Sequence, residues 1–326
     1  MPQPHLYVAR TLTPAVMAEL DDLGLPVVAG EEAPPARDRL LAGIAGAAAA
    51  IVTLTERVDA ELLDAAGPQL RVVANVAVGY DNIDLEAAAE RGVVVCNTPG
   101  VLDDATADHT FAMLLATTRR VVEADRFART GRPWIWGPNM LVGLDISADA
   151  TLGIVGFGRI GRAVARRAHA FGMRVITSDP GLNVGDAVDG VTVVGFEELL
   201  ATADVVSLHV PLLPSTRHLI DASALARMRP RSYLVNAARG GVVDESALID
   251  ALRSGHLAGA ALDTFEGEPR INPEFAGLEN VVLQPHIASA GDRTRDAMCR
   301  LAVRNVTRVL AGEPAETPVR TPVATA

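Results

Sequence analysis

A glycine motif in the middle of the chain constrains the fold more than any other feature. Residues 151–161 read TLGIVGFGRIG and contain the pattern G-x-G-x-x-G. The motif follows an apolar run, opens a helical pattern, and precedes a second apolar run that ends at Asp179, 23 residues after Gly156. A strand, a glycine turn, a helix and a second strand ending in an acid form the setting in which this motif binds a dinucleotide. The sequence therefore predicts a doubly wound α/β domain with a parallel sheet.

Each glycine has a distinct role in this interpretation. Gly156 permits the tight turn, Gly158 lets the backbone approach a pyrophosphate, and Gly161 lets the helix lie close to the strand. The helix N-terminus offers unpaired N–H groups and a partial positive charge to the phosphates. The other loop residues expected beside the cofactor are Phe157, Arg159 and Ile160. An ordinary glycine-rich turn is the alternative, which the acid at Asp179 disfavours.

Asp179 also bears on which dinucleotide binds. A carboxylate at the end of the second strand accepts hydrogen bonds from ribose hydroxyls and repels a 2′-phosphate. No arginine occurs between Pro180 and Leu208, and the chain contains no lysine. The sequence therefore favours NAD over NADP, and so NADH over NADPH as the reductant.

Composition excludes several functional classes. A chain of 326 residues is expected to form about two domains, and its 49% apolar residues suffice for sizeable cores. The formal net charge of -11 argues against nucleic-acid binding, which needs a basic surface. The absence of lysine excludes a Schiff-base or P-loop lysine. The two cysteines, Cys96 and Cys299, are expected to be buried apolar side chains, and no metal site is expected.

No segment predicts export or membrane insertion. The N-terminal sequence lacks a basic region followed by an apolar stretch and a cleavage site. The longest apolar run, over 40–54, is shorter than the roughly 20 residues that a membrane helix needs. A cytoplasmic protein with no membrane partner is expected.

Short apolar runs alternate with helical patterns along the chain, as in parallel sheets covered on both faces. In the first hundred residues, strands are expected at 6–9, 50–54, 72–76 and 93–96, and helices at 13–23, 58–66 and 85–91. One long helix is expected over 103–130, followed by an irregular stretch over 131–143. Later strands are expected at 151–155, 174–177, 191–193, 205–208, 233–236, 258–262 and 281–283, and later helices at 159–171 and 293–310. The tail after Gly312 is expected to be loosely ordered.

Five further motifs surround the glycine motif. NVAVGYDNID (75–84) and NTPGVLDDATAD (97–108) precede it, and VNAARG (235–240), LDTFEGEP (262–269) and QPHIAS (284–289) follow it. Together these motifs resemble the NAD(P)-dependent D-2-hydroxyacid dehydrogenases, and within them the glyoxylate/hydroxypyruvate reductase branch. The resemblance implies reduction of glyoxylate or hydroxypyruvate to the D-2-hydroxy acid by hydride transfer from NADH.

The resemblance also implies an organisation. The chain would form two Rossmann- or flavodoxin-like doubly wound domains with parallel sheets, the cofactor domain being inserted into the substrate domain. Residues 1–100 and 287–326 would form the substrate-binding, catalytic domain, and residues 101–286 the dinucleotide-binding domain. Relatives usually form homodimers through the segment that matches 103–130. In this branch one tryptophan reaches the neighbouring subunit's site, and Trp134, Trp136 or neither corresponds to it.

Motif positions imply that Arg239, Glu268 and His286 are the catalytic trio. A guanidinium can hold the carboxylate of a 2-oxo acid by paired, charge-assisted hydrogen bonds. A group that can hold a proton near neutral pH must stand beside the carbonyl oxygen that becomes an alkoxide, which favours His286. A neighbouring carboxylate orients that histidine and stabilises its protonated form. Glu266 is the alternative acid, and Glu268 is preferred because the family's acid directly precedes a proline.

The resemblance assigns further contacts. The backbone N–H groups of Val78 and Gly79 would receive the substrate carboxylate, and Ser289 would contact substrate together with Arg239 and His286. The remaining cofactor contacts would be Thr106, His209, Val210, Pro211, Ala237 and Asp263, with Thr106 near the nicotinamide and Asp263 accepting from its carboxamide.

Two other functions stay open. A phosphoglycerate dehydrogenase or another D-2-hydroxyacid dehydrogenase would share the chemistry. A non-catalytic NAD-sensing module would share the fold, and it would bind NADH without turning over a 2-oxo acid.

Overall fold

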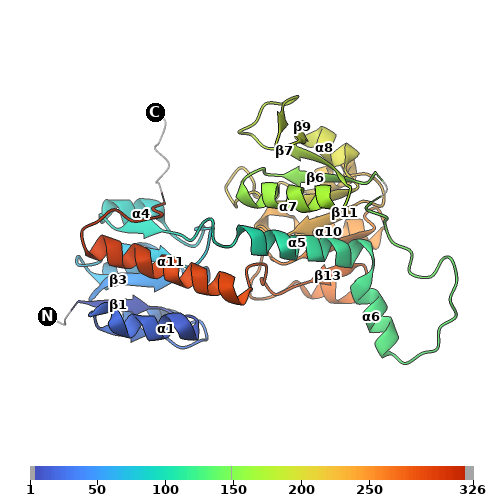
Figure 1. Ribbon diagram of the computed structural model, residues 1–326. Coiled ribbons are helices and arrows are strands. Elements are labelled where there is room, and N and C mark those ends of the chain that lie inside the picture. The colour runs from blue at the N-terminus through green and yellow to red at the C-terminus, as the bar shows by residue number, and fades with distance from the viewer. Residues whose placement is uncertain (1–3, 148, 320–326) are drawn as a thin grey trace. The chain divides into compact units, whose positions relative to one another are not determined.

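The computed structural model describes residues 4–147 and 149–319, which form two units (Figure 1). The first unit consists of the described residues of Met1–Leu102 and Ala290–Ala326, and the second of those in Asp103–Ser289. We call them the terminal unit and the inserted unit. Each has a sheet whose strands are all or nearly all parallel, with helices on both faces, so the predicted fold class is confirmed.

The sheet of the terminal unit has five parallel strands in the order β2-β1-β3-β4-β5. This is the flavodoxin-like order of a doubly wound sheet. The strands are β1 His5–Val8, β2 Val27–Ala29, β3 Ala47–Val52, β4 Val72–Asn75 and β5 Val94–Cys96. The helices are α1 Pro14–Leu20, η1 Asp21–Leu23, α2 Arg37–Ile44, α3 Ala60–Ala66, α4 Leu85–Glu90 and α11 Asp292–Leu310. Side chains of α2, α3 and α4 share one core with alternate strand residues, while α11 packs against β3, β4 and β5.

The sheet of the inserted unit has eight strands in the order β13-β12-β11-β10-β6-β7-β9-β8, and only β8 is antiparallel. Strands β9-β7-β6-β10-β11-β12 reproduce the Rossmann order, which reverses between β6 and β10. The strands are β6 Thr151–Val155, β7 Arg174–Ser178, β8 Ala187–Val188, β9 Val191–Val193, β10 Val205–Leu208, β11 Tyr233–Asn236, β12 Gly259–Leu262 and β13 Val281–Leu283. Helices α5 Asp103–Thr118 and α7 Arg159–Ala170 contribute to one core. Helices α8 Phe196–Thr202, α9 Ala222–Arg227 and α10 Glu245–Arg253 contribute to the other, and α6 Val121–Arg129, η2 Gly240–Val242 and η3 Pro273–Gly277 complete the unit.

The single long helix predicted over 103–130 is wrong. The chain forms α5 and α6 with a break at Arg120, whose φ of 53° lies in the left-handed region. That conformation cannot continue a right-handed helix. The apolar residues of α5 face the sheet, whereas α6 buries no residue completely, so the two helices have different environments.

The loosely ordered tail predicted after Gly312 is also wrong as far as Val319. The Val319 N–H donates to the Val95 carbonyl at 2.7 Å, and the Thr317 N–H donates to Asn305 Oδ1 at 2.9 Å. These bonds fix the segment beside β5 and α11. The rest of the predicted tail, 320–326, lies outside the described residues.

Both cysteines, Cys96 and Cys299, are free and buried as predicted, and burial raises the pKa of Cys96 to about 12. None of the helices in the described part of the chain has the length and apolar character needed to cross a membrane.

Candidate active site

One edge of the inserted sheet carries most of the polar residues predicted from the motifs. Because β6, β7 and β10 to β13 are all parallel, their carboxyl ends meet at this edge. The loops that follow these strands contain, in strand order from β6, the glycine motif, Asp179, His209–Pro211, Ala237–Arg239, Asp263 and His286. Parallel pairing alone therefore brings these segments together.

The glycine loop has the geometry of a phosphate cradle. Gly156 has a φ of +92°, and a Cβ there would lie 2.8 Å from the carbonyl oxygen of His209. A Cβ on Gly161 would lie 2.3 Å from the carbonyl oxygen of Gly156, so α7 can approach β6 this closely only with glycine at this position. Gly158 is the N-cap of α7, and a Cβ there would meet no atom within 4 Å. The N-terminus of α7 is thus open for a dinucleotide pyrophosphate.

Asp179 lies directly against this loop. Its Oδ2 accepts the Phe157 N–H at 2.7 Å, and its Oδ1 accepts the Gly181 N–H at 2.8 Å. A carboxylate oxygen can accept more than one hydrogen bond, so both oxygens retain capacity for ribose hydroxyls. The glycine loop and Asp179 therefore fit a dinucleotide cofactor.

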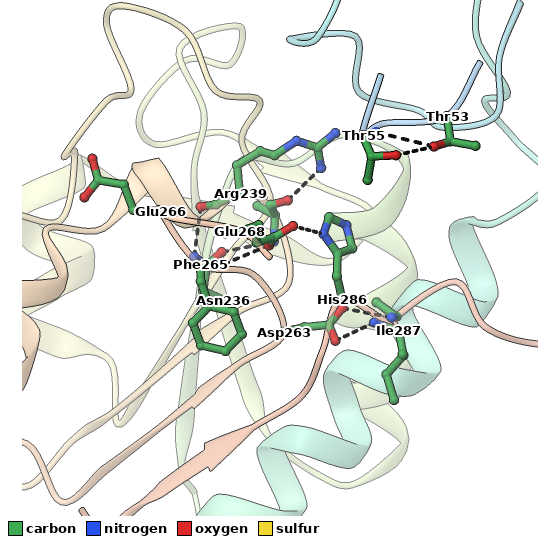
Figure 2. Close-up of polar contacts among 12 residues, drawn as sticks. Thr53, Thr55, Asn236, Arg239, Asp263, Phe265, Glu266, Glu268, His286 and Ile287 are labelled. Atoms are coloured by element: carbon green, nitrogen blue, oxygen red, sulfur yellow. Dashed lines mark hydrogen bonds and ion pairs between the residues drawn. The ribbon is translucent and has the colours of Figure 1, made fainter. Parts of the chain in front are cut away.

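His286 and Glu268 form a hydrogen-bonded pair (Figure 2). His286 Nδ1 lies 2.8 Å from Glu268 Oε2, and the other oxygen, Oε1, accepts the Phe265 N–H at 2.9 Å. The side chains of His286 and Glu268 are 23% and 29% exposed. The carboxylate is thus fixed by the backbone and in turn fixes the imidazole, whose Nε2 stays available on the opposite side of the ring.

Glu266 belongs to a different cluster. It forms ion pairs with Arg217 and His218, and its N–H donates to Glu245 at 2.8 Å. The carboxylate that hydrogen-bonds to His286 is therefore that of Glu268, the acid preferred from the motif, and not that of Glu266.

Arg239 is placed by a close backbone contact. Its Nη1 donates to the Ala238 carbonyl at 2.9 Å, and the Asn236 amide at the end of β11 donates to the Arg239 carbonyl at 2.9 Å. A Cβ on Gly240 would lie only 1.9 Å from the backbone of Phe265. The arginine loop therefore packs directly on the segment that holds Glu268.

Asp263 organises the loop that carries His286. It is fully buried, and its two carboxylate oxygens accept the N–H groups of Ile287 and Ala288, both at 2.8 Å (Figure 2). Its carbonyl oxygen accepts the His286 N–H at 2.8 Å. These bonds hold His286 at a φ of 54°, a conformation that is costly for a residue with a Cβ. The motifs predicted Asp263 as a cofactor contact and missed this structural role.

His109 on α5 is a further residue that the motifs missed. Its Nε2 is buried without a hydrogen-bond partner in the described structure and lies 3.5 Å from Asp263 Oδ1. Only the packing of α5 against the sheet creates this proximity, so no local signal could have revealed it. Thr106 lies on α5 about one turn earlier and is 4% exposed.

His209 differs from His286 in its surroundings. Its Nε2 lies 2.8 Å from the hydroxyl of the buried Ser207, and desolvation lowers its pKa to about 4. His209 is therefore neutral at pH 7 and is unsuited to donate a proton there. The next residues, Val210 and Pro211, continue the loop, and the Thr216 hydroxyl donates to the Pro211 carbonyl at 2.6 Å.

The remaining predicted residues lie elsewhere in the fold. Ala237 is half-buried between β11 and Arg239, and Ser289 is the half-buried last residue of the inserted unit. Val78 and Gly79 belong to the terminal unit, in the loop after β4.

Comparisons with known proteins agree with this geometry. The family described as "D-isomer specific 2-hydroxyacid dehydrogenase, NAD binding domain" matches residues 111–288. A glyoxylate reductase from Korarchaeum cryptofilum is 45% identical over 316 residues, which cover 95% of this chain and 94% of that protein. The solved structure of the TT0316 protein from Thermus thermophilus has a TM-score of 0.91 at 45% identity, covering 97% and 100% of the two chains. An NADPH-dependent glyoxylate/hydroxypyruvate reductase from Sinorhizobium meliloti, solved with NADP and malonate, has a TM-score of 0.84 at 33% identity, covering 98% and 100%.

The environment of His209 makes the protein's stability sensitive to acid. A histidine in the unfolded chain takes up a proton near its ordinary pKa of 6.5, whereas His209 in the fold resists protonation until pH about 4. Its contribution to the free energy of unfolding is complete above pH 6.5 and is lost as the pH falls toward 4, by on the order of 3 kcal/mol. Urea unfolding followed across this pH range measures the loss.

His209→Gln should flatten this acid dependence relative to wild type. His169→Gln, at an exposed position on α7, is the matched control and should leave it unchanged. An acid dependence that is the same in wild type and His209→Gln would contradict the assignment.

Proposed function

The chain belongs to the D-isomer specific 2-hydroxyacid dehydrogenase family, and we propose that it reduces glyoxylate or hydroxypyruvate to the 2-hydroxy acid with NADH. Where the product is chiral, it is the D isomer. The observation that carries the proposal is the His286–Glu268 pair, at 2.8 Å, on the sheet edge that also holds the glycine loop. The activities of the relatives from Korarchaeum cryptofilum and Sinorhizobium meliloti, a glyoxylate reductase and a glyoxylate/hydroxypyruvate reductase, support these two acids as substrates.

The glycine loop and Asp179 are the residues that would hold NAD. When bound, this cofactor supplies a hydride to the carbonyl carbon of the substrate. The N-terminus of α7 stabilises the pyrophosphate, and Asp179 accepts from the adenosine ribose. Thr106, His209 to Pro211, Ala237 and Asp263 complete the proposed cofactor contacts.

His286 supplies the proton. As the carbonyl oxygen gains negative charge, a protonated imidazole beside it donates from Nε2, and the ring is left neutral. Glu268 accepts from Nδ1–H, which stabilises the imidazolium before transfer and keeps the hydrogen on Nδ1 afterwards. The carboxylate is in turn held by the Phe265 N–H, so the imidazole keeps its orientation through the reaction.

Arg239 and backbone N–H groups bind the substrate's carboxylate. A guanidinium offers paired N–H donors that match a carboxylate. In the terminal unit, the N–H groups of Val78 and Gly79 are proposed donors to the substrate carboxylate, and in the inserted unit Ser289 is a proposed substrate contact. These local donors must outweigh the repulsion of an anion by a chain with a net charge of -11.

Three features favour NADH over NADPH. Asp179 presents negative charge where a 2′-phosphate would lie. The segment from Pro180 to Leu208 contains no arginine. Arg162, which stacks on Phe157 at 4.7 Å from the ring centroid, is ion-paired with Asp189. The Sinorhizobium meliloti relative is described as NADPH-dependent, and the proposed preference for NADH rests on these three features of the present chain.

Initial rates of NADH and NADPH oxidation with glyoxylate, hydroxypyruvate, pyruvate and 2-oxoglutarate test the proposal. Fast turnover of NADH with the first two substrates is expected. Turnover only with another 2-oxo acid would favour a different D-2-hydroxyacid dehydrogenase, such as a phosphoglycerate dehydrogenase. Binding of NADH without turnover of any of the four acids would favour a non-catalytic NAD-sensing module.

Replacing the proton donor should separate chemistry from binding. His286→Gln should lower kcat for glyoxylate by about 100-fold or more, because general acid catalysis contributes at least that factor. The Kd of NADH, measured by fluorescence, should stay within about twofold of wild type, since His286 is not required for cofactor binding. His169→Gln should change neither quantity, and a near-normal kcat in His286→Gln would refute the role.

Removing the carboxylate of Asp179 should weaken the preference for NADH over NADPH. Asp179→Ala should lower the ratio of kcat/KM for NADH over NADPH by about tenfold or more, because a like charge near the phosphate is removed. Asp186→Ala is the matched control, since this exposed acid lies in the same segment. An unchanged ratio in Asp179→Ala would mean that the ribose is recognised elsewhere.

We also propose a homodimer formed by α6 and the irregular stretch over 131–143. Its side chains include Trp134, Ile135 and Trp136, which are 63%, 94% and 81% exposed. Exposed apolar groups in one stretch mark an interaction surface.

Replacing both tryptophans should weaken the dimer. Trp134→Ser combined with Trp136→Ser should shift the protein from dimer to monomer in sedimentation velocity, because the exposed apolar area at the interface is lost. Val184→Ser, at a 67% exposed position outside this stretch, should remain dimeric. A wild-type protein that sediments as a monomer would overturn the proposal.

A further inference from the structure

Three successive carbonyl groups in the loop after β4 are each held by a hydrogen bond. The Ala77 carbonyl accepts the Thr98 N–H at 2.8 Å. The Val78 carbonyl accepts from Asn97 Nδ2 at 2.7 Å, and the Gly79 carbonyl accepts from Asn75 Nδ2 at 2.9 Å. Asn75 ends β4 and Asn97 follows β5, so all three donors come from the carboxyl edge of two paired strands.

These bonds determine where the N–H groups of the loop point. In a trans peptide unit the C=O and the following N–H point in opposite directions. The N–H groups of Val78, Gly79 and Tyr80 are therefore directed away from the three donors. Val78 and Gly79 are half-buried and Tyr80 is 38% exposed, so the loop as a whole is open to solvent. Successive backbone N–H groups facing one side form a site for an oxyanion.

Both the N–H and the carbonyl group of Asn97 form hydrogen bonds that fix its backbone. Its N–H donates to the Thr317 carbonyl at 3.3 Å, and its carbonyl accepts from the Thr317 hydroxyl at 2.7 Å. Thr317 is held by Asn305, a fully buried residue of α11, whose Nδ2 donates to the threonine hydroxyl at 2.8 Å. The amide of Asn97 thus has a fixed position relative to the sheet.

Asn75 is held by a second chain of amides. It is fully buried, and its Nδ2 also donates to Asn82 Oδ1 at 3.1 Å. The Asn82 amide donates to the carbonyls of Thr53 and Glu56 at 3.0 and 2.9 Å. Because both acceptors of Asn75 are oxygens, its side chain can only be oriented with the NH₂ group toward the loop.

We propose that Asn97 and Asn75 are positioning residues for binding of the substrate's carboxylate, and that the Tyr80 N–H is a third donor to it. This inference rests on the proposed function, in which Val78 and Gly79 bind that carboxylate. The side-chain amides fix the orientation of the loop carbonyls by hydrogen bonds, so the N–H groups of the loop are already oriented before the anion binds. Aspartate or leucine at either position would offer no donor, because only the amide combines this size with an N–H group.

Steady-state kinetics of Asn97→Ala test the role of the amide. Loss of the hydrogen bond to the Val78 carbonyl should raise the KM for glyoxylate, and the inhibition constant of malonate, by roughly three- to tenfold. The kcat and the Kd of NADH should stay within about twofold, because the cofactor site is untouched. Asn183→Ala, which removes an exposed amide from the inserted unit, should change none of these values. Unchanged KM and malonate inhibition in Asn97→Ala would overturn the proposal.

Amide NMR of the wild-type enzyme with NADH provides a test that needs no variant. Titration with malonate should shift the amide protons of Val78, Gly79 and Tyr80 to lower field. If the amide protons of Val78 and Gly79 shift and that of Tyr80 does not, the Tyr80 N–H is excluded as a third donor to the anion. Turnover of a 2-oxo acid with no shift of these amides would overturn the inference and leave the function standing. Shifts of all three without turnover would support the anion site and refute the reductase.

Discussion

Parallel pairing of strands determines where this protein can place its chemistry. In a parallel sheet all carboxyl ends lie on one edge, where the N-termini of the following helices also begin. In the inserted unit this edge brings together residues that are more than 100 positions apart in the chain, from the glycine loop at Gly156 to His286. The close approach of Gly156 to the His209 carbonyl shows how tightly the two central strand ends are joined at the point where strand order reverses.

Two carboxylates fix the loops at this edge by accepting hydrogen bonds from backbone N–H groups. Asp263 is buried, and its carboxylate accepts hydrogen bonds from two backbone N–H groups. These bonds hold His286 in an unfavourable backbone conformation. The half-buried Asp179 accepts the Phe157 N–H and so fixes the glycine loop. A charged acceptor forms stronger hydrogen bonds than a neutral one, and this compensates for burial and local strain. The loops at the edge can therefore be rigid without being part of the sheet.

In both units, an asparagine at the end of an interior strand binds nearby backbone groups through its side-chain amide. Asn236 ends β11 and binds both the Ala238 N–H and the Arg239 carbonyl. Asn75 ends β4 and binds the Gly79 carbonyl. In each case the amide satisfies backbone groups that the sheet no longer pairs, and it does so without adding charge near an anionic substrate.

The sequence by itself determined the parallel α/β class, most of the strands and the glycine loop, and its short motifs proposed the candidate catalytic residues. These follow from local signals, because apolar runs, glycine spacing and short motifs are each contained within a few residues. Strand β2 escaped prediction because it is three residues long and mostly exposed, and helix α2 because it leads directly into an alanine-rich strand. The short helices α8, α9 and α10 and the two-residue strand β8 were not predicted either. The motif already favoured Glu268 over Glu266, and the structure shows that Glu268 pairs with His286. The tertiary structure alone decided that His109 approaches Asp263 and that Thr317 holds Asn97. Such contacts join residues from different elements, and their existence depends on how those elements pack.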